Sequence, residues 1–190
     1  MLRELLPTSP VLDALLALML LQHSRRDARA ATLGSLVLLP DQDWSLWHQD
    51  EIAEGLTLLT PWVGEASSDT PYLVEALIAA EHAVAPNAQD TAWPRIADLY
   101  AELEAATASP VVRLNRAVAV AETEGPSAGL ALLAGLDLPG NHRLPAVRGE
   151  LLMRSGRRNE AAAAFTEALA LCGNAVERRF LEERQRAVVG

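Results

Sequence analysis

The sequence predicts an all-α fold of stacked antiparallel helical hairpins that ends in a C-terminal capping helix. Alanine and leucine, which are among the best helix formers, dominate a composition in which only 4% of the residues are aromatic. Helix starts are marked by a hydroxyl residue followed by proline, at Ser9-Pro10, Thr70-Pro71 and Ser109-Pro110. The steps of about 39 residues from Pro71 to Pro110 and about 35 from Pro110 to Pro145 are typical of an array with two helices per repeat.

The N-terminal third is expected to hold two helices and a long connector. The first helix is predicted over about 10–27, with an inner side formed by Leu12, Leu15, Leu16, Met19 and Leu20. Residues 28–43 form the connector, in which Leu36 to Leu39 would be a short extended segment. A helix over about 44–60 follows, and Pro61 and Gly64 mark its end. Residues 1–6 are expected to be the tail of a preceding helix.

The rest of the chain is predicted to form three hairpins and a cap. The hairpins pair residues 71–84 with 91–107, 110–123 with 126–135, and 145–155 with 158–171. A last helix over about 175–188 would cap the stack, because the end of such an array must hide one apolar face and offer a polar one. We therefore expect one all-helical domain over 1–190, with N-terminal helices and connector in 1–60, hairpins in 71–172 and the cap in 175–188.

The charge and the cysteine content narrow the function classes. A formal net charge of -9 disfavours nucleic-acid binding, which depends on basic groups. The arginines near the C-terminus alternate with glutamates and indicate a solvated, salt-bridged helix face, the alternative being a nucleic-acid patch. The apolar run Val11–Leu21 contains Asp13 and is shorter than the roughly 20 residues that a bilayer span needs. With a single cysteine, Cys172, and no export signal, we expect a cytoplasmic protein without membrane contact.

One segment resembles the second helix of a tetratricopeptide repeat (TPR). It begins with Gly156-Arg157-Arg158-Asn159-Glu160-Ala161 and continues through Phe165 and Ala168. Gly149 stands where that repeat has its small residue, which lets two helices approach closely, and Phe165 would fill the gap between hairpins. Pro145, Arg148 and Gly173 depart from the repeat pattern. The fold that this resemblance implies is TPR-like rather than a regular repeat array.

A second resemblance extends over nearly the whole chain. The strings that carry it are Leu15 to Leu21, Leu36 to Asp43, Ile52 to Leu56, Ser109 to Ala121 and Asn174 to Leu181. They look like the C-terminal TPR-like extension of a group of bacterial extracytoplasmic-function (ECF) RNA polymerase sigma factors. Trp44 stands where this group would have an arginine after Asp-Gln-Asp. The resemblance implies that polymerase-binding and promoter-reading domains would lie upstream of this chain.

The densest group of polar and aromatic residues lies in the segment from Asp41 to Glu51. Asp41 and Asp43 alternate as in a calcium loop, but glycine is missing from the sixth position and glutamate from the twelfth, so we expect no metal. In the structural interpretation, Asp43 or Ser45 caps the next helix and Trp47 belongs to the core. In the functional one, Asp41, Asp43, Trp44 and Trp47 contact a peptide or small molecule.

A second tentative binding group lies in the first helix of the middle hairpin, where a TPR-like fold lines its groove. It comprises Arg113, Asn115 and Arg116, which can hold a carboxylate or a backbone amide. Alternatively, the asparagine bonds to a neighbouring helix and the arginines are exposed. The four histidines have no ligand spacing on one helix, and Cys172 is expected to be a buried, inert thiol.

These observations predict a domain that is not an enzyme and needs no cofactor. The leading hypothesis is a regulatory, protein-interacting domain of an ECF sigma factor. Its partner would be the sigma-factor core domains, RNA polymerase or a regulatory protein, without direct nucleic-acid contact. The alternative is a small-molecule-sensing helical domain with a pocket near residues 28–51.

Overall fold

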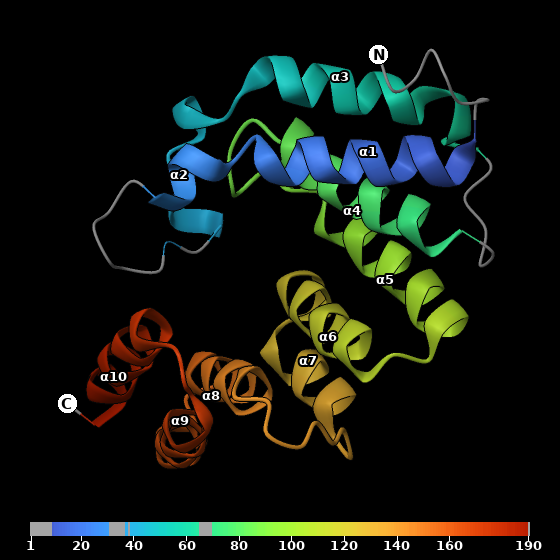
Figure 1. Cartoon of the computed structure of the whole chain (residues 1–190). Helices are drawn as coiled ribbons and strands as arrows, with labels where there is room; N and C mark the ends of the chain where they lie inside the picture. The colour runs from blue at the N-terminus through green and yellow to red at the C-terminus, as the bar shows by residue number, and fades with distance from the viewer. Residues whose placement is uncertain (1–8, 31–36, 38, 65–69, 190) are drawn as a thin grey trace. The chain divides into compact units, whose positions relative to one another are not determined.

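The computed structural model describes residues 9–30, 37, 39–64 and 70–189. Throughout these residues the regular structure is helical, with no strand, which confirms the predicted all-α class (Figure 1). The described chain forms two compact units, which divide between Ala108 and Ser109. Unit 1 contains the elements up to α5, and unit 2 contains α6 to α10. A single domain over 1–190 stays a prediction.

Unit 1 is built around α1, which packs against both α3 and α4, while α4 packs against α5. Its helices are α1 (Pro10–His23), α2 (Arg26–Ala30), α3 (Gln49–Leu59), α4 (Pro71–Val84) and α5 (Trp93–Thr107). Three 3₁₀ turns complete it: η1 (Leu39–Asp41), η2 (Trp44–Leu46) and η3 (Thr60–Trp62). The first predicted hairpin therefore corresponds to α4 and α5. None of the helices in the described ranges combines the length and the apolarity needed to cross a bilayer.

Two predicted helices of unit 1 are shorter in the structure. The first ends at His23 instead of 27, because Ser24 turns the chain and its hydroxyl donates to the Leu21 carbonyl oxygen (2.8 Å). The helix expected from residue 44 begins at Gln49. Residues 44–46 form a separate turn, and the His48 N–H bonds outside its own helix to the Ser24 carbonyl oxygen (2.9 Å). The expected helix tail at residues 1–6 lies outside the described residues. Of the expected extended segment, residues 36 and 38 also lie outside them, and Leu39 begins η1.

The predicted inner face of the first helix is wrong. The side of α1 that packs into unit 1 carries Asp13, Ala14, Ala17 and Leu21. Small side chains suit this side because α3 approaches it closely: a Cβ added at Gly55 would lie 3.1 Å from Leu21 Cγ and 3.4 Å from the Ala17 carbonyl oxygen. The large residues that the sequence suggested as core, Leu12, Leu15, Leu16 and Met19, are exposed on the other side.

Unit 2 consists of helices that pack in succession. They are α6 (Pro110–Glu124), α7 (Pro126–Leu133), α8 (Arg143–Arg154), α9 (Arg158–Leu171) and α10 (Ala175–Val189). The pairs α6–α7 and α8–α9 occupy the two predicted hairpins, and α10, in the place of the predicted cap, packs on α9. Helix α8 begins two residues before the predicted 145, because the Asn141 side chain accepts a hydrogen bond from the Arg143 N–H (2.8 Å).

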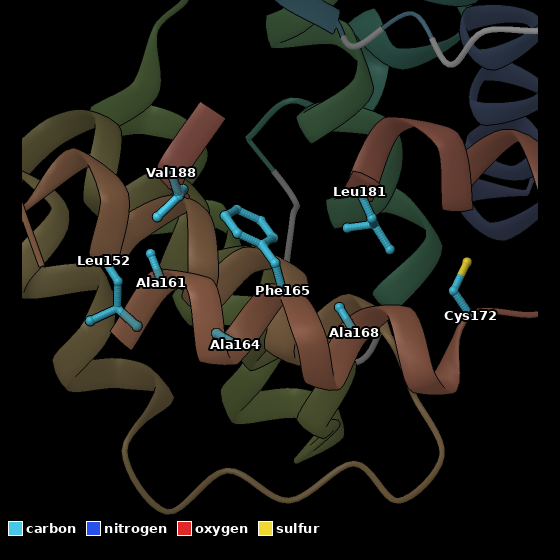
Figure 2. Close-up of a cluster of buried hydrophobic side chains, with 8 residues drawn as sticks. All are labelled: Leu152, Ala161, Ala164, Phe165, Ala168, Cys172, Leu181 and Val188. Carbon is cyan, nitrogen blue, oxygen red and sulfur yellow. The ribbon is translucent and has the colours of Figure 1, made fainter. Parts of the chain in front are cut away.

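One core cluster of unit 2 is organised around Phe165, which is fully buried. Figure 2 shows its ring among side chains from α8, α9 and α10, including Leu152, Ala161 and Val188. Helix α8 contributes Gly149 to this contact: a Cβ there would lie 2.9 Å from Phe165 Cε1. The expected close approach of helices at Gly149 is therefore present.

Candidate functional site

The outer face of α1 is the largest group of exposed apolar side chains that the described residues place on one helix. It comprises Val11, Leu12, Leu15, Leu16 and Met19, and we call it the α1 apolar face. Their exposed fractions run from 36% for Leu16 to 60% for Met19. At 100° per residue, Met19 and Leu12 lie near the middle of this face, opposite the buried side of the helix. Exposed apolar patches of this kind are typical of protein-interaction sites.

Beside the C-terminal end of this face, charged side chains from α1, α2 and α3 meet. Arg26 donates from Nη1 to both carboxylate oxygens of Glu51, at 2.8 and 2.9 Å. His23 Nδ1 lies 3.0 Å from Glu51 Oε2. Arg26 Nη2 lies 2.9 Å from His48 Nδ1, and His48 Nε2 lies 2.7 Å from Asp27 Oδ2. These contacts tie the short helix α2 to the start of α3.

The same contacts fix the protonation pattern of His48. A guanidinium only donates hydrogen bonds, so Nδ1 of His48 must accept from Arg26. The imidazole proton is then on Nε2 and is donated to Asp27. This hydrogen bond is the main reason why the pKa of the Asp27 carboxyl is held below its usual range. The donors and acceptors of these contacts are thus defined. We call the group of His23, Arg26, Asp27, His48 and Glu51 the charged clamp.

A second group in unit 1 combines aromatic rings with a partly buried cation. Trp47 is buried and stacks on Trp44, with ring centroids 4.2 Å apart. The Arg25 guanidinium carbon lies 5.4 Å from the centre of the Trp47 ring, within cation–π range. Burial lowers the pKa of Arg25 to about 10. Among the described residues no carboxylate forms an ion pair with Arg25, whose Nη2 donates to Gln22 Oε1 (2.6 Å).

His82 on α4 belongs to this group and is also perturbed. Its ring meets the edge of Trp93, with centroids 5.4 Å apart. Burial, followed by the positive charge of Arg25, lowers the pKa of His82 to about 4. His82 is therefore neutral at physiological pH, and it lies half-buried in the last turn of α4.

His82 predicts a pH dependence of stability. An unfolded histidine titrates near 6.5, so between pH 6.5 and 4 the unfolded state binds more protons than the folded state. The free energy of unfolding should therefore fall as the pH drops through this window, by about 2–3 kcal/mol from His82 alone. Urea unfolding at pH 4 to 7 should show a flatter dependence for His82→Gln. Parallel curves for the two proteins would contradict this assignment.

The structure places the first predicted binding group as follows. Asp41 is exposed at the end of η1. Asp43 caps η2 by accepting from the Ser45 backbone N–H (2.9 Å) and hydroxyl (2.6 Å), and these bonds lower the pKa of its carboxyl. Trp44 is half-buried, and Trp47 is in the core. The core position expected for Trp47 is confirmed. Asp43 caps the separate turn η2 instead of the helix predicted over 44–60, because α3 begins only at Gln49. Ligand contact by this group stays a prediction.

The second predicted group lies on α6, in unit 2, whereas the first belongs to unit 1. Arg113 Nε donates to the Leu132 carbonyl oxygen (2.8 Å) and so bonds α6 to α7. Asn115 and Arg116 are half-buried on the same helix. The structure thus gives Arg113 a packing role within its hairpin. A binding role for the three residues stays a prediction.

Comparison with known proteins finds similarity over most of the chain. Residues 1–62 match a family model described as a family of unknown function (DUF6596). An uncharacterized protein of Rhizobium meliloti (strain 1021) is 43% identical over 183 residues, which cover 95% of this chain and 43% of the relative. The chain therefore spans less than half the length of this curated relative. No solved structure matches.

Sequence reasoning missed the α1 apolar face and most of the charged clamp. His48 and Glu51 stand in the polar segment that the sequence singled out, but their partners lie 21 to 28 residues earlier. An ion pair across such a separation leaves no periodic signal in a single sequence. The apolar composition of α1 was visible, but it indicated core rather than surface because both sides of the helix carry apolar residues.

Proposed function

We propose that this chain is a regulatory, protein-interacting domain of an ECF sigma factor with TPR-like stacking of its helices. The observation that carries the proposal is the α1 apolar face, where five large aliphatic side chains on one helix are exposed. Full burial of one such side chain contributes roughly 1.5–3 kcal/mol. A partner that covers Leu12, Leu15 and Met19 would therefore gain enough free energy to bind specifically.

The partner best suited to this face is another protein helix. The exposed residues follow the i, i+1, i+4, i+5, i+8 spacing of one helical stripe, which a second apolar helix can cover by packing ridges into grooves. The sigma-factor core, itself expected to be helical from the resemblance, offers such helices. The charged clamp at the end of the face, with exposed His23, supplies the polar rim that protein interfaces usually have.

The sigma-factor context rests on the sequence strings and agrees with the length of the relative. That relative extends well beyond the region similar to this chain, so it has room for polymerase-binding and promoter-reading domains. The net charge of -9 disfavours a direct role on DNA and favours one through protein contact. In this role, the domain would bias the position or accessibility of the core domains and so tune transcription initiation.

The proposal is tested in the full-length Rhizobium meliloti relative. Its region equivalent to this chain is deleted, and transcription from its target promoter is measured with purified RNA polymerase. We expect the transcript yield to change, and the separately purified region to bind the remainder of the protein. Unchanged transcription together with no binding would refute the proposal.

A second function, small-molecule sensing in unit 1, is favoured by one observation. Arg25 is a partly buried cation beside Trp47 and has no carboxylate partner among the described residues. Such a guanidinium suits a small carboxylate ligand. Thermal-shift measurements with a panel of carboxylate metabolites should then reveal a stabiliser that has no effect on Arg25→Gln. A panel without any such compound favours the protein-interaction function alone.

A further inference from the structure

Three side chains of different types, each able to ligate a metal, meet within unit 2. They are His142, directly before α8, Cys172, directly after α9, and Glu177, in the first turn of α10. One ligand atom from each lies within 4.8 Å of the other two. His142 Nε2 and Glu177 Oε2 are already 2.9 Å apart, and the Cys172 side chain is buried.

Neighbouring hydrogen bonds hold each of these residues in place. The Asn141 side chain accepts a hydrogen bond from the Arg143 N–H (2.8 Å) and so fixes the turn that carries His142. The Asn174 side chain accepts from the backbone N–H groups of Val176 (2.8 Å) and Glu177 (3.2 Å), which positions the first turn of α10. Arg178 Nη2 donates to the Cys172 carbonyl oxygen (2.5 Å). Hydrogen bonds outside the three ligating side chains thus help to fix the backbone of the cluster.

We propose that His142, Cys172 and Glu177 bind a zinc ion. A thiolate, an imidazole and a carboxylate are the three kinds of ligand that zinc takes in proteins, at bond lengths of about 2.0–2.3 Å. The thiolate favours zinc over magnesium or calcium, which prefer oxygen ligands. One thiolate and one carboxylate also balance the charge of the ion. A water molecule completes the tetrahedron at the fourth position.

The geometry requires little movement. Ligand atoms around a tetrahedral zinc ion lie about 3.3–3.8 Å apart, as follows from bonds of about 2.0–2.3 Å. The separations of up to 4.8 Å are therefore closed by a small rotation of side chains. The Cys172 thiol donates one hydrogen bond, to the Asn174 carbonyl oxygen (3.5 Å), which it gives up when it loses its proton and binds the metal.

The metal would act as a clamp for α10. Cys172 lies at the edge of the Phe165 cluster, just beyond the end of α9 (Figure 2). A bound ion would join the turn before α8, the end of α9 and the start of α10. Metal affinity would then add directly to the stability of the last three helices, because an unfolded chain does not present the three ligands together.

Cobalt(II) provides a specific test, because it substitutes for zinc and absorbs in the near ultraviolet when a thiolate binds it. The chain has a single cysteine, so any such absorption must come from Cys172. Titration of the full chain with cobalt chloride should give this band with a stoichiometry of one, and zinc chloride should then remove it. Zinc should also raise the thermal unfolding midpoint, and EDTA should reverse that change.

The variants separate a metal site from a simple ion pair. Cys172→Ser should abolish the band, and His142→Asn and Glu177→Gln should each weaken cobalt binding at least about 100-fold, more than loss of an outer hydrogen bond does. Glu182→Gln, an exposed position on α10, is the matched control and should bind as the wild type does. Circular dichroism verifies that each variant is folded. Absence of the band in the wild type, or equal binding by Glu177→Gln and Glu182→Gln, would overturn the proposal.

Discussion

Replacing Leu12 and Met19 together by lysine should strongly weaken the binding of this chain to its proposed partner, the sigma-factor core, while leaving its fold intact. Both side chains lie near the middle of the α1 apolar face, with exposed fractions of 43% and 60%. Two charges there would have to be desolvated in the complex, and the apolar contacts would be lost as well. Central interface residues of this kind cost 2 kcal/mol or more on truncation, so we expect binding to weaken at least about 30-fold.

The stability of the isolated chain should change little in this double variant. Lysine is a good helix former, and exposed substitutions usually alter the free energy of unfolding by no more than about 0.5 kcal/mol each. Val84→Lys is the matched control, because Val84 on α4 is similarly exposed (55%) but lies off the α1 apolar face. Binding is measured by calorimetry against the remainder of the Rhizobium meliloti relative. If Val84→Lys weakened binding as much as the double variant, α1 would not be the interface.

Most helix positions were predictable because their start signals are local. Proline at the first helical position marks α1, α4, α6 and α7, and in each case the structure begins the helix there. The failure at residues 44–48 came from a bond between distant residues, because the Ser24 carbonyl oxygen takes the N–H of His48. A single sequence contains no signal for that bond.

The orientation of α1 could not be predicted for a different reason. Both sides of the helix are apolar: one carries Ala14 and Ala17, and the other carries Leu12 and Leu15. The periodic pattern therefore does not distinguish the two sides. Burial was decided by how closely α3 approaches, which depends on Gly55. Because the side with small residues packs against α3, the large residues of the α1 apolar face stay exposed and are available to a partner. The prediction from sequence thus failed at the element that we propose as the interface, where function and local patterning conflict.

The cluster of His142, Cys172 and Glu177 was equally hidden from the sequence. Its members come from three separate segments of the chain and have none of the short spacings that reveal metal sites on one helix or loop. Cys172 is buried, as the sequence predicted, but its two neighbours give it a chemical setting that its position alone did not indicate. Only the packing of α10 on α9 brings Glu177 to it.

Phe165→Ala should be the most destabilising single substitution in unit 2. The side chain is fully buried between α8, α9 and α10, and its removal leaves a cavity that the neighbouring Gly149 cannot fill. Truncation of a buried phenylalanine costs about 3–5 kcal/mol, which is a large part of the 5–15 kcal/mol typical of a domain. Phe165→Leu retains part of the contact and should cost less. Because Gly149 lies against the ring, Gly149→Ala should also destabilise the unit by overpacking.

Urea unfolding followed by far-ultraviolet circular dichroism measures this loss across both units. All four tryptophans (Trp44, Trp47, Trp62 and Trp93) belong to unit 1, so the fluorescence of the same samples reports on that unit specifically. Phe180→Ala is the control, since Phe180 on α10 packs on the same cluster but is only half-buried. Phe165→Ala should lower the urea midpoint of the circular dichroism transition more than Phe180→Ala does. If the two variants lowered it equally, α8, α9 and α10 would not be held together by this ring. The chain would then have to derive the stability of unit 2 from the α6–α7 side, where Leu114, Leu133 and Leu151 form a separate buried cluster.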